Sequence, residues 1–140
     1  MDIIDTLNIA GQGLSAQRVR LQTISSNMAN AKTTRTAEGG PYRRKAPVFN
    51  ATSIDEFGTA LEQALAGVDV EEIQVSKSEG QRVYQPDHPD ADGEGYVTYP
   101  DIDILSEMVD LMTTQRSYEA NANVIDVTGD LADRALEIGR

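Results

Sequence analysis

Residues 3–31 read IIDTLNIAGQGLSAQRVRLQTISSNMANA, and this stretch decides the fold that the sequence predicts. Apolar side chains recur in it in steps of four and three residues, which is the spacing of one face of a long helix. The positions are Ile3, Leu7, Ala10, Leu14, Gln17, Leu21, Ile24, Met28 and Ala31. A heptad stripe of about four repeats is typical of a helix that packs along another helix. We therefore predict a long helix that ends near Ala31, where a polar run begins.

A second stripe with the same steps lies at the other end of the chain. Its positions are Ile104, Met108, Leu111, Gln115, Tyr118, Ala122, Ile125, Gly129, Ala132 and Leu136. Pro100 favours a helix start close behind it, and Gly139 stands where a C-terminal cap belongs. We therefore predict a helix over residues 102–138. At about 1.5 Å per residue it would be roughly 55 Å long, so most of its length must pack against a partner.

The partner of each stripe could come from the same chain or from other chains. Pairing within one chain accounts for both stripes, yet two helices alone leave much of each stripe in water. We favour a bundle of helices from several chains, in which Gln17 and Gln115 fix the register and lower the stability. The expected assembly core is Leu7, Leu14, Gln17, Leu21, Ile24 and Met28 on the first helix and Met108, Leu111, Gln115, Tyr118, Ala122 and Ile125 on the second.

The segment after the first helix reads as an extended arm followed by a short helix. Gly39-Gly40-Pro41 breaks any helix, so residues 36–50 are expected to be turn and extended chain. Ser53 and Glu56 then form a capping box, which predicts a helix that stops at Gly67. Its apolar face would consist of Ile54, Phe57, Leu61 and Leu65.

Short strands follow this helix. Residues 68–75 carry alternating Val and Ile, and the alternation slips at Glu71-Glu72, which predicts a strand with a bulge. Residues 82–85 and 96–99 read as two further strands. The expected fold class is therefore mainly α with a small β module, in which long N- and C-terminal helices form a coiled-coil-like bundle. The expected organisation is an N-terminal assembly helix in residues 1–35, a central segment in residues 36–100 and a C-terminal assembly helix in residues 101–140.

The charge of the chain is large and unevenly placed. Its 140 residues include 12 Lys and Arg against 23 Asp and Glu, and the formal net charge is −11. Residues 1–50 carry +4 and residues 51–140 carry −15. So acidic a chain is a poor partner for nucleic acid or an anionic membrane surface. The asymmetry instead favours pairing of the two ends, within one chain or head to tail between copies.

No constellation in the sequence predicts catalysis. The chain has no Cys, which excludes disulfides, thiolate metal sites and a Cys nucleophile, and a single His offers no triad pattern. The Asp90–Asp101 loop has acids at positions 1, 3, 5 and 12 and Gly at position 6, a partial likeness to a calcium-binding loop. Pro89 and Pro100 deny that loop its flanking helices, so an acidic turn is the favoured interpretation, and we expect neither a metal nor a cofactor. No apolar run predicts a cleaved leader or a membrane span.

Several motifs resemble those of bacterial flagellar basal-body rod proteins, specifically of the proximal rod. The runs that carry the resemblance are Gly13-Leu14-Ser15-Ala16-Gln17-Arg18, Ser26-Asn27-Met28-Ala29-Asn30, Gly39-Gly40-Pro41-Tyr42-Arg43-Arg44, His88-Pro89-Asp90-Ala91 and Arg116-Ser117-Tyr118-Glu119-Ala120-Asn121. The likeness extends over nearly the whole chain. The element Ser26, Asn27, Ala29 and Asn30 is shared by rod, hook and hook-associated proteins, whereas the runs after it are similar to the proximal rod proteins in particular.

The resemblance implies a structural subunit of the rod, the drive shaft that passes motor torque to the hook and filament. It implies partners that include copies of the same chain, other proximal and distal rod proteins, the adaptor or MS ring at the base, and the flagellar type III export apparatus. It also implies a periplasmic location in the basal body, reached without a cleaved signal peptide. We expect lateral contacts from Gly39, Gly40, Pro41, Tyr42, Arg43 and Arg44. The competing hypotheses are a coiled-coil adaptor unrelated to motility and a small calcium-binding protein that uses the Asp90–Asp101 loop.

Overall fold

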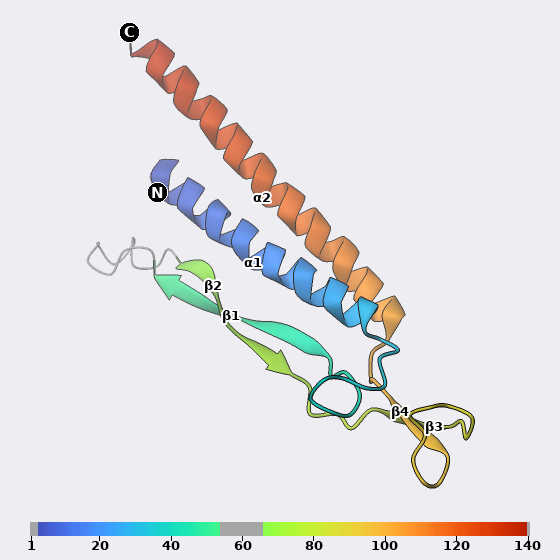
Figure 1. Ribbon diagram of the computed structural model, residues 1–140. Coiled ribbons are helices and arrows are strands. Elements are labelled where there is room, and N and C mark those ends of the chain that lie inside the picture. Colours follow the sequence, from blue (N-terminus) through green and yellow to red (C-terminus); the bar gives the residue numbers. More distant parts are fainter. Residues whose placement is uncertain (1–2, 54–65, 140) are drawn as a thin grey trace.

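The computed structural model describes residues 3–53 and 66–139, and it shows two long helices at the ends of the chain with a β-rich insert between them (Figure 1). The elements in chain order are α1 (Ile3–Ala29), β1 (Lys45–Ser53), β2 (Ala66–Val75), β3 (Gln81–Tyr84), β4 (Tyr96–Tyr99) and α2 (Ile104–Ile138). The helices lie side by side and run in opposite directions. The predicted fold class, mainly α with a small β module, is confirmed.

Both long helices were predicted to within about two residues at each described end. Helix α1 ends at Ala29, where the sequence predicted an end near Ala31. Helix α2 begins after Asp103, whose carboxylate accepts hydrogen bonds from the Leu105 and Ser106 amides at 3.2 and 3.4 Å. The Ser106 hydroxyl also donates to this carboxylate, and that bond is the main reason why the pKa of Asp103 lies below its ordinary value. Gly139 occupies the C-cap position as expected.

The first sheet is an antiparallel ribbon of β1 and β2. Val48 pairs with Glu72 and Phe49 pairs with Val70, so Glu71 is the extra residue of a bulge. This confirms the bulge that the slipped alternation predicted. Sequence reasoning treated residues 45–50 only as extended chain, and their pairing with β2 makes them a strand.

The predicted short helix with Ile54, Phe57, Leu61 and Leu65 on one face lies outside the described residues. The prediction that this helix stops at Gly67 is wrong at its end, because Ala66 and Gly67 already belong to β2. Gly67 is buried against α1, and a Cβ built on it would collide with the Gln12 carboxamide. The absence of a side chain is therefore what lets the ribbon approach the helix.

The second sheet is a short hairpin of β3 and β4, one residue away from the predicted bounds of its first strand. The rings of Tyr84 and Tyr96 meet edge to face with centroids 5.3 Å apart. The Arg82 guanidinium lies 4.8 Å from the Tyr96 ring centroid, which adds a cation–π contact. Val97 is the fully buried side chain of this hairpin.

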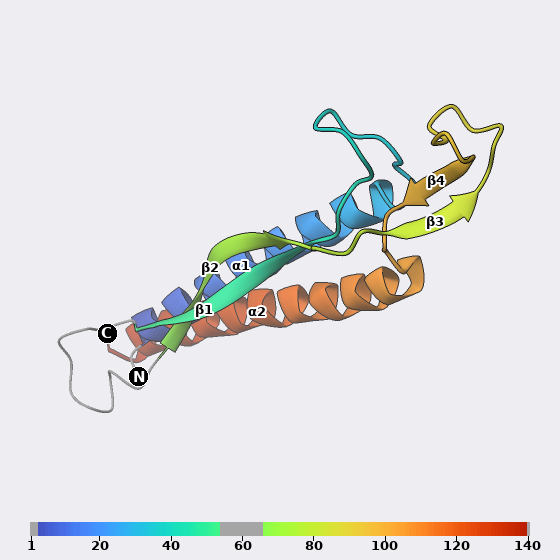
Figure 2. The ribbon, with the colours of Figure 1, turned by 90° about the horizontal axis from the view of Figure 1, so that it is seen from below.

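Helix α1 forms the middle of the molecule (Figures 1 and 2). Among the described elements α1 contacts α2, β1 and β2, whereas α2 contacts α1 alone. The buried hydrophobic core of the described residues is small, with Ala10, Ala16, Ile24, Ala31 and Val97. No helix in residues 3–53 or 66–139 is long and apolar enough to cross a membrane.

The two helices share one register along their length. Asn27 meets Glu107 at one end, and Gly13 meets Asn121 fourteen residues further along each helix. Because both helices rise by about 1.5 Å per residue, this register places Ile3 opposite Leu131. Residues 132–138 of α2 therefore run past the described start of α1, as Figure 1 shows.

Candidate functional site

A buried polar network joins the end of α1, the arm that follows it and the start of α2. We call it the clasp and define it as Asn27, Tyr42, Arg44 and Glu107. Asn27 is 1 % exposed and lies at its centre. Its Nδ2 donates to the Lys45 carbonyl at 2.8 Å and to Glu107 Oε2 at 3.2 Å. Its Oδ1 accepts from the Lys45 amide at 2.9 Å and from the Tyr42 hydroxyl at 3.1 Å. Every donor and acceptor of this carboxamide is therefore used.

Glu107 brings a buried charge to the clasp. It is 1 % exposed, and its Oε1 accepts from Arg44 Nε at 2.6 Å. The Arg44 side chain is 38 % exposed and also lies 3.8 Å from Asp110 through Nη2. A buried carboxylate is tolerated only when it is paired and hydrogen-bonded, and Glu107 is both. One cation from the arm thus fixes the first turns of α2.

The spacing of the Ser-Asn-x-Ala-Asn element follows from two separate tasks. The Asn30 side chain donates to the Ser26 carbonyl at 2.9 Å, a carbonyl that also accepts from the Asn30 amide at 3.1 Å, and so reinforces the end of α1. The hydroxyl groups of Ser26 and Tyr42 lie 3.1 Å apart, and the Tyr42 amide donates to the Thr33 carbonyl at 3.0 Å. Asn27 turns inward to the clasp, whereas Ala29 is exposed. The motif therefore ends the helix and folds the arm back on it.

The arm makes its turn with two glycines. Gly39 and Gly40 have φ values of +88° and +75°, a conformation that side-chain-bearing residues rarely adopt. The Thr36 amide donates to the Gly40 carbonyl at 2.9 Å, which closes the loop. Both glycines are exposed, and Pro41 and Tyr42 are half-buried behind them. This geometry places the predicted lateral segment at the surface while Tyr42 and Arg44 remain tied to the clasp.

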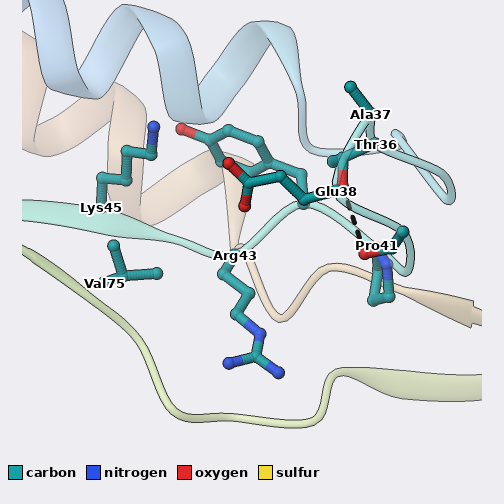
Figure 3. A pocket seen from close by; sticks show the side chains of 9 residues that line it. Thr36, Ala37, Glu38, Pro41, Arg43, Lys45 and Val75 are labelled. Carbon is teal, nitrogen blue, oxygen red and sulfur yellow. Dashed lines mark hydrogen bonds between the residues drawn. The ribbon is translucent and has the colours of Figure 1, made fainter.

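A hollow of about 590 Å³ lies beside this turn (Figure 3). It is lined by Thr36, Ala37, Glu38, Gly39, Pro41, Tyr42, Arg43, Lys45 and Val75. The Lys45 ammonium lies 5.7 Å from the centroid of the Tyr42 ring. Arg43 points away from Glu38 in Figure 3, toward the chain that leaves β2. We call this feature the arm hollow.

The acidic loop of the hairpin uses its carboxylates to hold the chain. Asp92 Oδ1 accepts from the Tyr96 and Glu94 amides at 2.9 Å each, and Oδ2 pairs with Arg82 at 2.7 Å. The Tyr96 amide is the main reason why the pKa of Asp92 lies below its ordinary value. Asp90 Oδ2 accepts from the Thr34 hydroxyl at 2.7 Å and so ties the loop to the arm.

These hydrogen bonds use carboxylate oxygens of Asp90 and Asp92 that a calcium ion would need as ligands. In the described part of the chain, no three or more His, Cys, Asp or Glu side chains gather as a metal site would require. His88 lies in the same loop and accepts the Asp90 amide hydrogen bond through Nδ1 at 3.1 Å. The structure therefore gives no support to the calcium hypothesis, and the favoured interpretation as an acidic turn explains the contacts.

The face of α2 that lies on α1 is polar. Glu107, Thr114 and Thr128 are buried at 1, 2 and 8 % exposure, and half-buried Asn121 packs on Gly13. These four positions follow one another at intervals of seven residues, so they form one face of the helix. The apolar stripe of α2 is displaced from this face. Its Leu111, Ala122, Ile125, Gly129 and Ala132 are half-buried, whereas Ile104, Met108, Gln115, Tyr118 and Leu136 are exposed.

The stripe of α1 lies on the inner side of the molecule. Ala10, Ile24 and Ala31 are buried, and Leu7, Leu14, Gln17, Leu21 and Met28 are half-buried. Gln17 Oε1 is buried and has no hydrogen-bond partner among the described residues. The chain thus brings the predicted core of the first helix together, and it leaves much of the predicted core of the second helix open.

Sequence reasoning missed Glu107 and the polar face behind it. Periodicity counts apolar residues, so a seam of Glu, Thr and Asn at heptad spacing gives no signal in such a count. The spacing of Glu107, Thr114, Asn121 and Thr128 was nevertheless visible in the sequence. The sequence did not show that the arm brings Arg44 to Glu107, and this ion pair is what allows Glu107 to be buried.

Comparison with known proteins identifies relatives over the whole chain. A family model described as "Flagella basal body rod protein" matches residues 7–35, and one described as "Flagellar basal body rod FlgEFG protein C-terminal" matches residues 94–138. The flagellar basal-body rod protein FlgC of Bacillus subtilis (strain 168) is 40 % identical, with all of both chains covered. FlgC of Borreliella burgdorferi is 37 % identical over 99 % of this chain and 98 % of the relative. FlgC of Salmonella typhimurium is 36 % identical over all of both chains.

Proposed function

This chain belongs to the flagellar basal-body rod proteins of the FlgC family and is a structural subunit of that rod, and from this membership we propose how its surfaces build the assembly. Helix α2 supplies the packing surface for neighbouring subunits. The clasp holds α2 to α1 and to the arm in one register. The arm carries lateral contacts at the end of the molecule where the clasp lies.

The observation that carries this proposal is the bare apolar side of α2. Large side chains on it are exposed: Leu105 at 70 %, Val109 at 57 %, Met112 at 57 %, Val127 at 59 % and Leu131 at 58 %. We call these five residues the outer stripe. With a turn of about 100° per residue, Leu105, Val109 and Met112 point away from the buried polar face of α2, whereas Val127 and Leu131 lie on the flank of that face near Thr128. Such a stripe on a helix with a single helical partner is typical of a surface that other chains cover.

The energetics favour assembly over the free chain. Fully burying one Val, Leu or Met side chain contributes roughly 1.5–3 kcal/mol, so burial of the outer stripe by neighbouring chains would add several such contributions. Met108, Gln115 and Tyr118 are exposed beside it and extend the surface that neighbours would contact. The polar face of α2 that packs on α1 adds little hydrophobic stabilisation of its own. Packing between chains therefore completes the helical layer.

The same arrangement suits the transmission of torque. A twist applied to α2 passes to the arm through the Arg44–Glu107 pair and to α1 through Asn27. The neighbours that receive it are other copies and the adjoining rod proteins, from the adaptor or MS ring at the base to the distal rod. The subunit reaches the periplasmic rod through the flagellar type III apparatus without a cleaved signal peptide. Its role is mechanical and involves no catalytic step.

Charged substitutions in the outer stripe test this proposal. In a host that lacks its own copy, Val109→Glu with Met112→Glu should abolish swimming and leave basal bodies without a rod, because two carboxylates would enter an apolar contact. The matched control is Ser15→Glu with Gln22→Glu, which places the same charges at exposed positions of α1. The control should swim. Normal swimming by the outer-stripe variant, at equal cellular amounts, would contradict the proposal.

A further inference from the structure

The last turns of α2 extend beyond the described part of α1. The register that pairs Asn27 with Glu107 places Ile3 opposite Leu131. The remaining turns project from the end of the molecule opposite to the arm (Figures 1 and 2). We call residues 130–138 the α2 tip. Most of this helical projection extends beyond the described start of α1 at Ile3.

The α2 tip is both apolar and acidic. Leu136 is 73 % exposed and Ile138 is 87 % exposed. Asp130, Asp133 and Glu137 stand against a single cation, Arg134, and none of these four forms an ion pair with a described residue. A surface of apolar side chains flanked by unpaired carboxylates is complementary to a surface that has an apolar wall and cations without ion-pair partners.

The arm hollow has these properties at the opposite end of the molecule. Pro41, the Tyr42 ring and Val75 form its apolar wall, and Val75 is 45 % exposed. Arg43 and Lys45 have no acid within ion-pair distance among the described residues. The five ion pairs that the described residues form involve other cations. The Arg43 guanidinium points away from Glu38, the acid among the residues that line the hollow (Figure 3).

We propose that the α2 tip of one copy seats in the arm hollow of the next copy. The inference rests on the proposed function, because it names one contact within that assembly. Leu136 or Ile138 would lie against the apolar wall, and Asp133 and Glu137 would face Arg43 and Lys45. The occupant is a second copy because both halves of the contact are present on each chain with opposite charge.

This contact joins two different surfaces, so it does not close on itself. Each copy keeps a free hollow at one end and a free tip at the other. Repetition of such a contact gives an open row of subunits that point in one direction. Such a row would pair the basic region of one copy with the acidic tip of the next. Residues 32–45 hold five basic residues against one acid.

Cysteine crosslinking tests the contact directly, because the chain contains no Cys. A chain with Ala37→Cys, in the lining of the hollow, is mixed at high concentration with a chain carrying Ala135→Cys in the tip, and a short bis-maleimide is added. We expect roughly tenfold more crosslinked heterodimer than from the control mixture of Ser15→Cys with Ala135→Cys, because the two opposed charge pairs remain in place and would favour the seated arrangement by about that factor. Equal yields from the two mixtures, or no crosslink in either, overturn the proposal.

Charge exchange gives a second readout. Arg43→Glu with Lys45→Glu should weaken self-association roughly tenfold in sedimentation, and so should Asp133→Lys with Glu137→Lys. An equimolar mixture of these two variants should recover it, because each reversed hollow then meets a reversed tip. The control Arg18→Glu with Lys32→Glu should associate as the unmodified chain does. If outer-stripe variants stop swimming while the mixture fails to recover, the head-to-tail contact is wrong and the rod function stands.

Discussion

Asn27 on α1 donates a hydrogen bond of 3.2 Å to Glu107 on α2, across 80 positions of sequence. Both residues are 1 % exposed, so this contact lies in the driest part of the molecule. It couples a family motif at the end of the first helix to an acid in the first turn of the second. The relationship explains why a chain with few buried apolar side chains still holds two long helices in one register.

Replacement of Asn27 by Ala should destabilise the chain more than its size suggests. The substitution removes all four hydrogen bonds of the carboxamide, including those to the Lys45 backbone groups and to Glu107 Oε2, while Glu107 Oε1 keeps its bond to Arg44. We expect a loss of about 2–4 kcal/mol in the free energy of unfolding, as each unsatisfied buried group costs roughly 1–3 kcal/mol. Thermal unfolding followed by circular dichroism measures it. The exposed control Asn8→Ala should change stability by less than about 0.5 kcal/mol, and equal losses would refute the role of burial.

The Arg44–Glu107 pair should respond unequally to removal of its two members. Arg44→Ala leaves a buried carboxylate without its cation, a change that typically costs about 3–5 kcal/mol. Glu107→Ala leaves a cation that is 38 % exposed and still lies 3.8 Å from Asp110, so its loss should be smaller. A double-mutant cycle in urea unfolding measures both and their coupling. A larger loss from Glu107→Ala would contradict this assignment.

Gly67→Ala should loosen the ribbon from α1. The new Cβ would collide with the Gln12 carboxamide, and overpacking of this kind typically costs about 1–3 kcal/mol. Gln12→Ala in the same chain should recover part of the loss because it removes the obstacle. Gly93→Ala is the matched control, since nothing lies within 4 Å of its added Cβ. Similar melting temperatures for the Gly67 and Gly93 variants would disprove the close contact.

Acid should destabilise the chain in part through Asp92 and Asp103. The pKa of each lies below the ordinary value of 3.8, held down chiefly by the Tyr96 amide for Asp92 and by the Ser106 hydroxyl for Asp103. A lowered folded-state pKa contributes stability that is present above the unfolded-state pKa and is lost as the pH falls through the folded-state pKa. The midpoint temperature of thermal unfolding should therefore decrease when the pH is lowered below about 4. Asp103→Asn keeps an N-cap but cannot titrate, so its acid-induced drop should be smaller than that of the unmodified chain.

Amide exchange should be graded along α2 in the unassembled chain. Amides close to Glu107 are tied to α1 and to the arm, whereas residues 132–138 pass beyond the described start of α1. We expect slow exchange over the first turns and exchange near the unfolded rate over the tip, measured by mass spectrometry on dilute protein. Uniform protection from Ile104 to Ile138 would contradict the view that contacts with α1 and the arm are what stabilise α2.

Local chemistry made most of the secondary structure predictable. Pro100 and the stripe from Ile104 to Leu136 predicted α2, and the slip at Glu71 predicted the bulge in β2. These features depend on residues close together in the sequence, where spacing and turn chemistry dominate. The arm was harder, because residues 45–50 become a strand only through their pairing with β2.

The candidate site was only half predictable, because its members come from three segments. The site residues predicted from the sequence include Asn27 and Arg44, but not Glu107, although Glu107 begins a further run that carries the family resemblance. A buried acid is unfavourable by itself and becomes acceptable only beside its cation. The sequence could therefore name the arm and the motif, and it could not name the acid that joins them.

The sequence by itself determined that two long helices frame a β module and that the two ends carry opposite charge. Periodicity and composition are properties of the chain before it folds, so no tertiary contact is needed to read them. Only the tertiary structure decided which side of α2 faces inward. The periodic apolar residues predicted a seam, yet Arg44 and Asn27 draw Glu107 and the polar heptad inward and turn Leu105, Val109 and Met112 outward. The physical reason is that a buried charge must meet its partner, and that requirement fixes the rotation of α2.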